Sequence, residues 1–356
     1  MSVYLIAEAG VNHNGDKDLA MQLIDAACAS GSNAVKFQTF AAAALAAKDA
    51  PKAAYQKETT GVSETQFEML KRLELPHDWH FELRDYCKTK RIDFLSTPFD
   101  SGSLKFLVET IGMKTIKVPS GEITNGPFLL EIARTGRKVI LSTGMSTIDD
   151  IRCALGVLAF GQSTNGMQPS MQAFEDAFES EAGQAALKKN VSILQCTSAY
   201  PTPLDQANIK AISTLKDTFE LRTGFSDHTK GTIASLAAVA LGADVIEKHF
   251  TLDRALPGPD HKASLEPDEL CRLFLNIRDV EKSLGTGEKV QQPAEVDTAN
   301  VARKSLFTTR AIAKGKVFSD DALVAQRPGD GVSPMRYWDE IGTTAKRSYQ
   351  IGEKYE

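Results

Sequence analysis

Eight short apolar segments recur along the chain as far as His249, and each is followed by a polar turn and a stretch of helical periodicity. Strands separated by helices at about 30 residues a unit form parallel sheets, because each crossover needs a helix to return the chain. Eight such units predict a closed (β/α)8 TIM barrel of the α/β class rather than an open doubly wound sheet. The predicted strands are Tyr4–Ala7, Ala34–Gln38, Asp93–Ser96, Thr115–Val118, Lys138–Leu141, Val191–Gln195, Thr223–Phe225 and Val245–His249.

Helix boundary signals lie between these strands. Asp16 or Asp18 is a candidate first-turn residue for a helix after the first strand, and Gly31 is suited to the position just past its end. An alanine-rich helix over residues 232–241 is expected to end at Gly242, immediately before the last strand.

The sequence also predicts how the chain divides. We expect a barrel domain over residues 1–284, ending in a helix from Glu266 to Leu284, then a linker over 285–300 and a small β-rich domain over 301–356. The segment 162–190 is long for a connection within a barrel. It predicts either an extra surface helix with Phe174 and Phe178 on one face or disorder, and in neither case a catalytic role.

Composition limits the class of partner. The 41 basic and 46 acidic residues leave a net charge of −5, which provides no basic surface for nucleic acid or an anionic membrane. The N-terminal residues lack a basic stretch followed by an apolar one, and the five cysteines are scattered singly. We therefore expect a cytoplasmic protein that acts on small molecules.

Polar side chains gather just past the predicted strands, at the edge where barrel enzymes build their active sites. Two lysines, Lys36 and Lys117, lie there together with several hydroxyls, and such a set suits a phosphate or carboxylate ligand. The alternative is that each lysine extends into solvent. The hydroxyls at these strand ends belong to Thr97, Ser120, Ser142 and Ser226.

Two histidines and two carboxylates complete the set. His228 and His249 follow neighbouring strands and can converge on one divalent ion, for which manganese or magnesium is a better candidate than structural zinc. Glu8 and Glu122 are candidates for a general acid or base. Ordinary structure offers alternatives, namely hydrogen-bonded core histidines and carboxylates that pair with lysines.

Together these residues form a series of motifs that closely resembles the bacterial N-acetylneuraminate (sialic acid) synthase family, including its legionaminic acid branch. The resemblance runs nearly end to end, with the motifs in the family's order. The motifs are Glu8–Gly15 (EAGVNHNG), Val35–Thr39 (VKFQT), Ser96–Phe99 (STPF), Pro119–Glu122 (PSGE), Leu141–Met145 (LSTGM), Tyr200–Pro203 (YPTP), Gly224–His228 (GFSDH), Glu247–Phe250 (EKHF) and Gly258–His261 (GPDH).

The resemblance implies a role for each motif. It implies that the C-terminal domain is antifreeze-protein-like (SAF) and swaps across a homodimer, so that Arg327 enters the partner's site to contact the sugar. It implies that His228 and His249 bind Mn²⁺ or Mg²⁺, and that Gln38, Tyr200, Glu122 and Asp260 contact the sugar. With the reaction so implied, we expect Glu8 and Glu122 to be catalytic, Glu122 in proton transfer and Glu8 in placing the water or the ion. Phosphoenolpyruvate would be held by Lys36, Thr97, Lys117, Ser120, Ser142, Ser198 and Ser226, although Ser198 replaces an asparagine found in some members.

The activity expected from the resemblance is condensation of phosphoenolpyruvate with N-acetylmannosamine or a related 2-acetamido-mannose sugar, giving a nine-carbon 2-keto sugar acid and phosphate. One alternative is a legionaminic acid synthase that uses 2,4-diacetamido-2,4,6-trideoxymannose. A second is another condensing aldolase that uses a phosphorylated aldose, and a third is a carbohydrate-binding protein without catalysis. The motifs near Glu8 and Glu122 are at least as close to the legionaminate branch as to the N-acetylmannosamine branch.

Overall fold

The computed structural model describes residues 2–47, 52 and 64–356. The chain divides into two compact units, Met1–Gly285 (unit 1) and Thr286–Glu356 (unit 2), and each is described by itself. Among the described residues, no helix is both long and apolar enough to cross a membrane.

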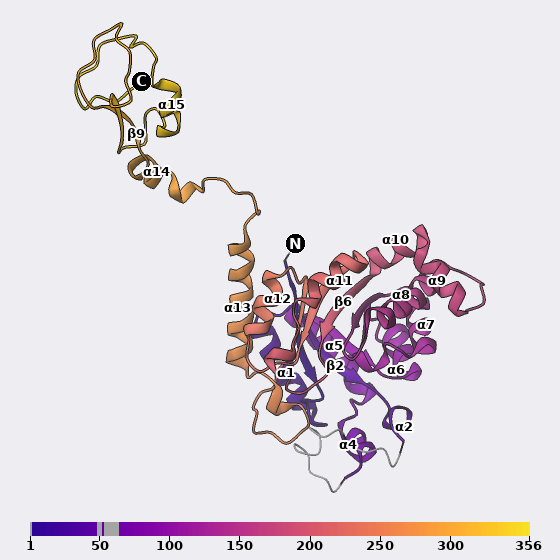
Figure 1. Ribbon diagram of the computed structural model, residues 1–356. Coiled ribbons are helices and arrows are strands. Elements are labelled where there is room, and N and C mark those ends of the chain that lie inside the picture. Colours follow the sequence, from indigo (N-terminus) through magenta and orange to yellow (C-terminus); the bar gives the residue numbers. More distant parts are fainter. Residues whose placement is uncertain (1, 48–51, 53–63) are drawn as a thin grey trace. The chain divides into compact units, whose positions relative to one another are not determined.

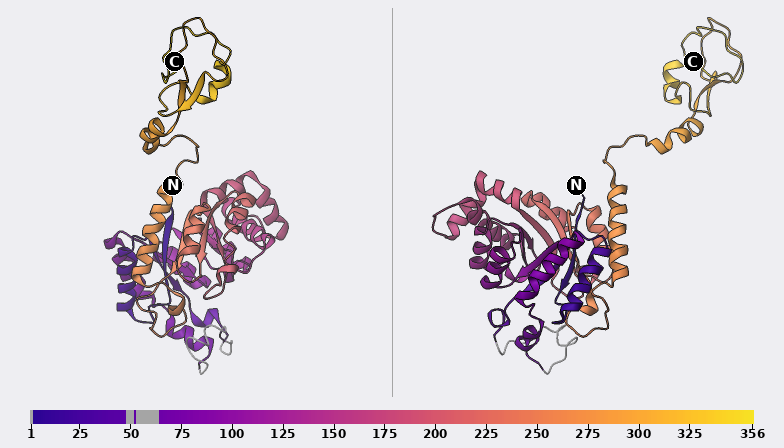
Figure 2. Two further views of the ribbon diagram at one scale, coloured as in Figure 1. Left: turned by 60° about the vertical axis from the view of Figure 1, so that its left-hand side comes forward. Right: turned by 180° about the vertical axis from the view of Figure 1, so that it is seen from behind.

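Unit 1 is built on one sheet of eight parallel strands surrounded by helices (Figures 1 and 2). The hydrogen-bonded order is β3-β2-β1-β8-β7-β6-β5-β4, and β3 also lies against β4, so the sheet is nearly closed. The predicted TIM-barrel fold is confirmed. The strands are β1 (Tyr4–Gly10), β2 (Ala34–Thr39), β3 (Asp93–Pro98), β4 (Thr115–Val118), β5 (Lys138–Ser142), β6 (Val191–Cys196), β7 (Arg222–Asp227) and β8 (Val245–His249).

Helices follow the strands as predicted. The Asp16 side chain caps the first helix by accepting from the amides of Asp18 and Leu19, and Gly31 takes a left-handed backbone just after the helix. The helices of the outer layer are α1 (Lys17–Ala29), α5 (His77–Lys90), α6 (Ser101–Lys105) continued by the π-turn Phe106–Thr110, α7 (Gly126–Arg134), α8 (Ile148–Ser163), α11 (Ala211–Phe219), α12 (Ile233–Ala240) and α13 (Pro267–Leu284).

Several strands extend further than the apolar runs predict. β1 continues to Gly10 and β7 continues to Asp227, so polar residues that we expected in turns belong to the strands themselves. Apolar periodicity ends where side chains begin to face the mouth of the barrel, but the backbone ladder continues. The first and last strands pair with each other, and Glu8 lies opposite His249 in that ladder.

The long segment between β5 and β6 is helical. It forms α9 (Met171–Glu179) and α10 (Glu181–Asn190), which pack on α8. Phe174 packs edge-to-face on Phe160 of α8, and Phe178 is buried. The prediction of an added surface helix is therefore right in kind, with two helices in place of one, and the disordered alternative is wrong.

Unit 2 is small and contains an antiparallel pair, β9 (Ser305–Thr308) and β10 (Leu323–Gln326). Its core includes Leu306, Phe318 and Tyr349. Short helical turns precede and follow the pair, and two of them, Pro293–Glu295 and α14 (Val296–Ala302), begin within the stretch where we expected a linker. The others are Pro334–Arg336 and α15 (Tyr337–Glu340).

Candidate active site

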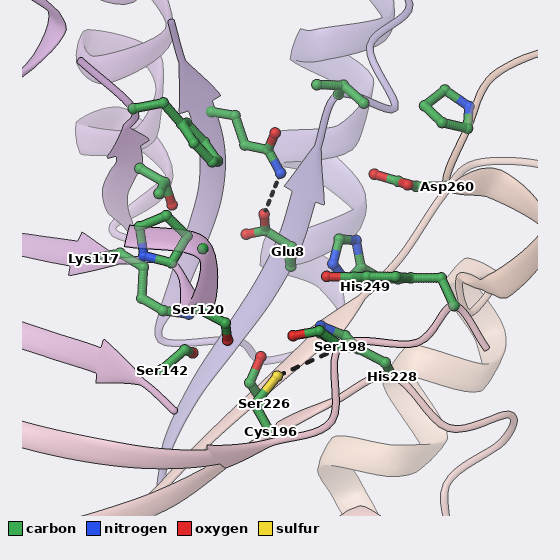
Figure 3. A pocket seen from close by; sticks show the side chains of 18 of the residues that line it. Glu8, Lys117, Ser120, Ser142, Cys196, Ser198, Ser226, His228, His249 and Asp260 are labelled. Atoms are coloured by element: carbon green, nitrogen blue, oxygen red, sulfur yellow. Dashed lines mark hydrogen bonds between the residues drawn. The ribbon is translucent and has the colours of Figure 1, made fainter. Parts of the chain in front are cut away.

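A cavity of about 380 Å³ opens at the carboxyl ends of the strands in unit 1 (Figure 3). Its size falls in the range of small-molecule sites. The structure brings nearly all the predicted site residues together in its lining: Glu8, Lys36, Gln38, Thr97, Lys117, Ser120, Ser142, Ser198, Tyr200, Ser226, His228, His249 and Asp260.

Strand alternation explains why the charged residues face the cavity. Val35 and Phe37 pack in the same apolar cluster as Leu23 and Ile24 of α1, on the outside of the barrel. Because successive side chains of a strand point to opposite faces, Lys36 points inward. The same alternation on β8 turns Glu247 and His249 inward, so a polar layer caps the apolar interior.

The inward lysines are paired with carboxylates. The Lys36 ammonium lies 2.6 Å from Glu8 and 3.6 Å from Glu247, and it donates to the Thr97 hydroxyl at 3.0 Å. Lys117 contacts both oxygens of Glu247, at 2.6 and 2.8 Å. We call these four charged residues the inner network. The predicted alternative that each lysine reaches solvent is wrong, since Lys36 is 3% exposed and Lys117 is 5% exposed.

Burial and pairing separate the acidities of the two carboxylates. Burial raises the pKa of Glu8 to about 7, although Lys36 acts in the opposite direction. Burial would also raise the pKa of Glu247, but Lys117 and Lys36 outweigh it and the net shift is downward. The opposite directions of the two pKa shifts favour an ionised Glu247 over an ionised Glu8.

The two histidines lie next to each other in the cavity lining, with ring centroids 5.4 Å apart and the rings tilted by 58°. The Tyr200 ring packs on His228 at 4.1 Å, and the Nδ1 atom of His228 lies 2.9 Å from the Thr197 carbonyl. The pKa of His249 lies well below its usual value. Burial is the largest cause, and the neighbouring His228 is the second. Burial acts likewise on His228, but Cys196 and the Thr197 carbonyl outweigh it and raise its pKa.

The histidine pair His228 and His249 has features that fit a divalent ion. His249 Nδ1 is buried without a hydrogen-bond partner, and a neutral imidazole nitrogen is a metal ligand. Among the described residues, no cluster of three or more His, Cys, Asp or Glu side chains is arranged to hold a metal. The pair therefore suits an ion that takes its remaining ligands from water and substrate oxygens, as magnesium and manganese do.

Hydroxyl groups lie on the side of the cavity formed by β4, β5 and β6. Ser120 Oγ accepts from the Gly144 amide at 3.0 Å, and Ser142 Oγ is buried without a partner. A Cβ atom at Gly144 would lie 2.7 Å from Ser120 Oγ and would also clash with Ser198 Oγ. The glycine thus lets two hydroxyls converge beside the lysines.

Two predicted residues are not among those that line the cavity. Glu122 ends a 3₁₀ turn (Ser120–Glu122), where its carboxylate accepts from Asn125 at 2.7 Å. Arg327 belongs to unit 2, where it is exposed and its Nε donates to the Ala302 carbonyl at 3.0 Å.

Sequence reasoning assigned no role to Glu247 or Cys196, although both line the cavity beside residues that were predicted. Glu247 joins both lysines, and the Ser226 hydroxyl donates to it at 2.8 Å. Its position two residues before His249 was a usable signal, because strand alternation turns both inward. Cys196 lies 3.7 Å from His228 Nδ1, and no sequence pattern distinguished it from the other single cysteines.

A second buried ion pair lies on the outside of the same strands. Lys248 lies 2.9 Å from Asp227 and donates to the Thr229 carbonyl at 2.6 Å. Asp227 also accepts from the Thr229 amide and hydroxyl and from the Ser235 hydroxyl of α12. We call this set the outer network. It fixes the backbone that carries His228 and His249.

Comparison with known proteins places the chain. The NeuB family model matches residues 23–289. The chain is 46% identical to the N,N'-diacetyllegionaminic acid synthase of Campylobacter jejuni, over 98% of this chain and 97% of that protein. It is 41% identical to the N,N'-diacetyllegionaminic acid synthase of Legionella pneumophila, over 99% and 93%.

A solved structure agrees with these matches. The N-acetylneuraminic acid (sialic acid) synthetase from Leptospira borgpetersenii, in complex with citrate, superimposes with a TM-score of 0.67 at 33% identity. The match covers 84% of this chain and 90% of that one. The chain belongs to the NeuB family.

Proposed function

We propose that this chain is a nonulosonate synthase that condenses phosphoenolpyruvate with N-acetylmannosamine or a related 2-acetamido-mannose sugar. Water is consumed, and the products are a nine-carbon 2-keto sugar acid and phosphate. The observation that carries the proposal is the inner network beside two neighbouring histidines in one cavity. The relatives named as legionaminic and sialic acid synthases support the same reaction class.

The inner network suits phosphoenolpyruvate because its lysines are exchangeable cations. An arriving phosphate and carboxylate would compete with Glu8 for Lys36 and with Glu247 for Lys117, since both pairs line the cavity. The hydroxyls of Thr97, Ser120, Ser142, Ser198 and Ser226 would supply further donors. The buried, unpartnered Ser142 hydroxyl is a donor that such a ligand would satisfy.

His228 and His249 would hold a divalent cation. When bound, it would supply Lewis-acid activation of the aldehyde oxygen of the open-chain sugar. Gln38, Tyr200 and Asp260 line the same cavity and would contact the sugar. Burial raises the pKa of Asp260 to about 6. This carboxyl would donate a hydrogen bond to a sugar hydroxyl when protonated and accept one from it when ionised.

Bond changes follow from these positions. Carbon C3 of phosphoenolpyruvate attacks the sugar carbon C1, and the π electrons of the aldehyde pass to its oxygen, which takes up a proton. The attack leaves a cation at C2, to which water adds. The tetrahedral intermediate then loses phosphate by C–O cleavage while its C2 hydroxyl gives up its proton and becomes the ketone. Glu8, with its pKa near neutrality, would accept the proton from the attacking water. Glu122 would act in proton transfer only after a movement that turns it toward the cavity, because it does not line it.

The assembly is part of the proposal. A homodimer that exchanges its SAF-like second units would bring Arg327 of the partner subunit to the sugar. An exposed guanidinium provides planar donors that suit an N-acyl oxygen. A mass of twice the chain in equilibrium sedimentation would support the homodimer. An Arg327→Ala variant whose KM rises for the sugar but not for phosphoenolpyruvate would support the role of the arginine.

The test is phosphate release from phosphoenolpyruvate in the presence of manganese, with each of two acceptors and with or without EDTA. The acceptors are N-acetylmannosamine and 2,4-diacetamido-2,4,6-trideoxymannose. We expect release with at least one acceptor, and we expect EDTA to abolish it. If neither acceptor gives release, a phosphorylated aldose is tried as a third acceptor and sugar binding is measured by calorimetry. Release with the phosphorylated aldose would support a condensing aldolase instead, and sugar binding without release would support a non-catalytic carbohydrate-binding protein.

A further inference from the structure

A long loop between β8 and α13 reaches the cavity. We call residues 250–266 the β8 loop, and its residues Pro259 and Asp260 line the cavity (Figure 3). Asp260 is 8% exposed, and its carboxyl group forms no hydrogen bond or ion pair among the described residues. The place of this carboxyl group is therefore set by the backbone of the β8 loop and not by partners of its own.

The β8 loop is held by a side chain that follows β1. Asn12 is 2% exposed, and its Nδ2 atom donates to the Phe250 carbonyl at 2.8 Å and to the Ser264 hydroxyl at 3.1 Å. The Ser264 hydroxyl in turn donates to the Asp260 carbonyl at 2.7 Å. One amide group thus connects the end of β8 to the residue that carries the cavity carboxyl group. Asn12 itself is not among the residues that line the cavity.

The chemistry of its partners fixes the orientation of the Asn12 amide. The Phe250 carbonyl can only accept, and the Ser264 hydroxyl donates its one proton to Asp260, so both need a donor from Asn12. The Nδ2 group supplies two protons, whereas the Asn12 Oδ1 atom is buried without a partner. The connection therefore depends on the amide protons and not on the volume of the side chain.

A second link joins the β1 end to the β8 loop without Asn12. His261 is fully buried, with Nε2 3.1 Å from Asn14 Oδ1 and Nδ1 2.7 Å from the Thr251 hydroxyl. A Cβ atom at Gly258, whose φ is +155°, would lie 2.6 Å from His261 Cδ2 and 2.8 Å from Asn14 Oδ1. Because this packing is so close, loss of the first link should shift the turn within the β8 loop without unfolding the loop.

The lysines that would bind phosphoenolpyruvate have separate supports. Lys36 and Lys117 lie on β2 and β4 and are held by the carboxylates of the inner network. Within the part of the chain that the structure describes, the side-chain hydrogen bonds of Asn12 go to residues 250 and 264. A change at Asn12 should therefore affect the sugar and leave phosphoenolpyruvate binding as it is.

We propose that Asn12 is a positioning residue for the acceptor sugar, because it holds, through Ser264, the turn that presents Asp260 to the cavity. The inference rests on the proposed synthase function, in which Asp260 contacts the sugar. It adds a buried amide that touches no substrate to the groups on which sugar binding depends.

The test measures steady-state phosphate release with N-acetylmannosamine or 2,4-diacetamido-2,4,6-trideoxymannose, whichever the wild-type enzyme uses. Asn12→Asp keeps the shape of the side chain but removes its protons. We expect it to raise KM for the acceptor about tenfold and to change KM for phosphoenolpyruvate less than about twofold, since buried hydrogen bonds are lost on one side of the cavity. Asn33→Asp is the matched control and should leave both KM values as they are, because there the amide oxygen is the group in use and accepts from the Leu5 amide at 2.8 Å.

A double-mutant cycle with Asp260→Ala separates positioning from a general loss of structure. If Asn12 acts through Asp260, adding Asn12→Asp to Asp260→Ala should not raise KM for the acceptor further. Additive effects, or an equal rise in KM for both substrates, would overturn the inference and leave the proposed reaction intact. If Asn12→Asp does not fold by circular dichroism, Ser264→Ala takes its place in the cycle, with an expected rise of about threefold. A wild-type enzyme that releases no phosphate with either acceptor would overturn the proposed function and this inference together.

Discussion

The inner and outer networks use the same kinds of residue and lie on opposite faces of one shared strand, β8. Glu247 and Lys248 are adjacent in β8, and each is less than 5% exposed. The carboxylate of Glu247 points into a cavity and shares its lysines with Glu8, whereas Lys248 is enclosed by Asp227 and the Thr229 carbonyl. The inner network faces a cavity in which a ligand can replace one member of an ion pair. The outer network has no such space beside it.

This difference separates two uses of buried charge. A buried ion pair adds little net stability, because desolvation offsets most of the attraction, but loss of one partner is costly. The outer network therefore acts as a constraint on backbone position. The inner network maintains cations that an anionic substrate can take over, at a place from which water is largely excluded.

The largest expected effect comes from breaking the inner network at Lys117. Lys117→Met keeps the length of the side chain but removes the cation, and we expect kcat/KM for phosphoenolpyruvate to fall by about 10³-fold. Steady-state phosphate release measures the effect. Lys114→Met, at an exposed position just before β4, is the control. A loss smaller than tenfold would remove Lys117 from substrate binding.

Breaking the outer network should reduce stability. Asp227→Asn leaves the Lys248 ammonium buried without its counter-charge, and we expect the free energy of unfolding in urea to fall by about 3 kcal/mol. The double variant Asp227→Asn/Lys248→Met should recover much of this loss, because no charge is left behind. Equal effects of the single and double variants would show that the two side chains do not act as a pair.

The pH dependence of activity sharpens the contrast within the inner network. The pKa of Glu8 is raised to about 7, so its carboxyl is protonated below that pH and ionised above it. If the ionised form accepts the proton from water, kcat/KM falls about tenfold per pH unit as the pH drops below 7. The residual activity of Glu8→Gln should not show this decline below pH 7. If the variant shows a decline of the same slope, the decline belongs to the titration of another group.

The smallest expected effect is on substrate binding and comes from loss of a single hydroxyl. Two buried hydroxyls that lack hydrogen-bond partners can be compared, one on each face of the barrel. Ser142 lines the cavity, whereas Thr223 lies on the outward side of β7, in register with Phe225 and Asp227. Ser142→Ala should raise KM for phosphoenolpyruvate about three- to tenfold, the value of one hydrogen bond. Thr223→Val should leave KM unchanged. Equal behaviour of the two variants would show that Ser142 does not bind substrate.

Sequence patterns predicted the barrel because each strand and helix carries its own periodicity and end signals. They also identified most of the polar residues of the cavity lining, since polar residues that follow apolar strands meet at one edge. Glu122 departed from expectation because the chain leaves β4 in a 3₁₀ turn, where strand alternation no longer sets the direction of a side chain.

Other features of the site depend on contacts that local patterns do not encode. The partners of Lys36 and Lys117 are set by β1 and β8, which are distant in the sequence. The cavity lining also joins Leu45 and Leu70 to Val11 and Phe99 through tertiary packing, and each of these residues resembles ordinary core in the sequence. Residues whose role depends on a neighbour far along the chain need the structure.

The pairing of the first strand with the last has a consequence for synthesis of the protein. Glu8 lies opposite His249, so residues from the first and the last strand of the barrel in the sequence form one side of the cavity. A nascent chain on the ribosome cannot form this site until its eighth strand has emerged, although Glu8 is translated about 240 residues before His249. Binding competence therefore arises in a single late step, and fragments that end before β8 should accumulate without capturing substrate.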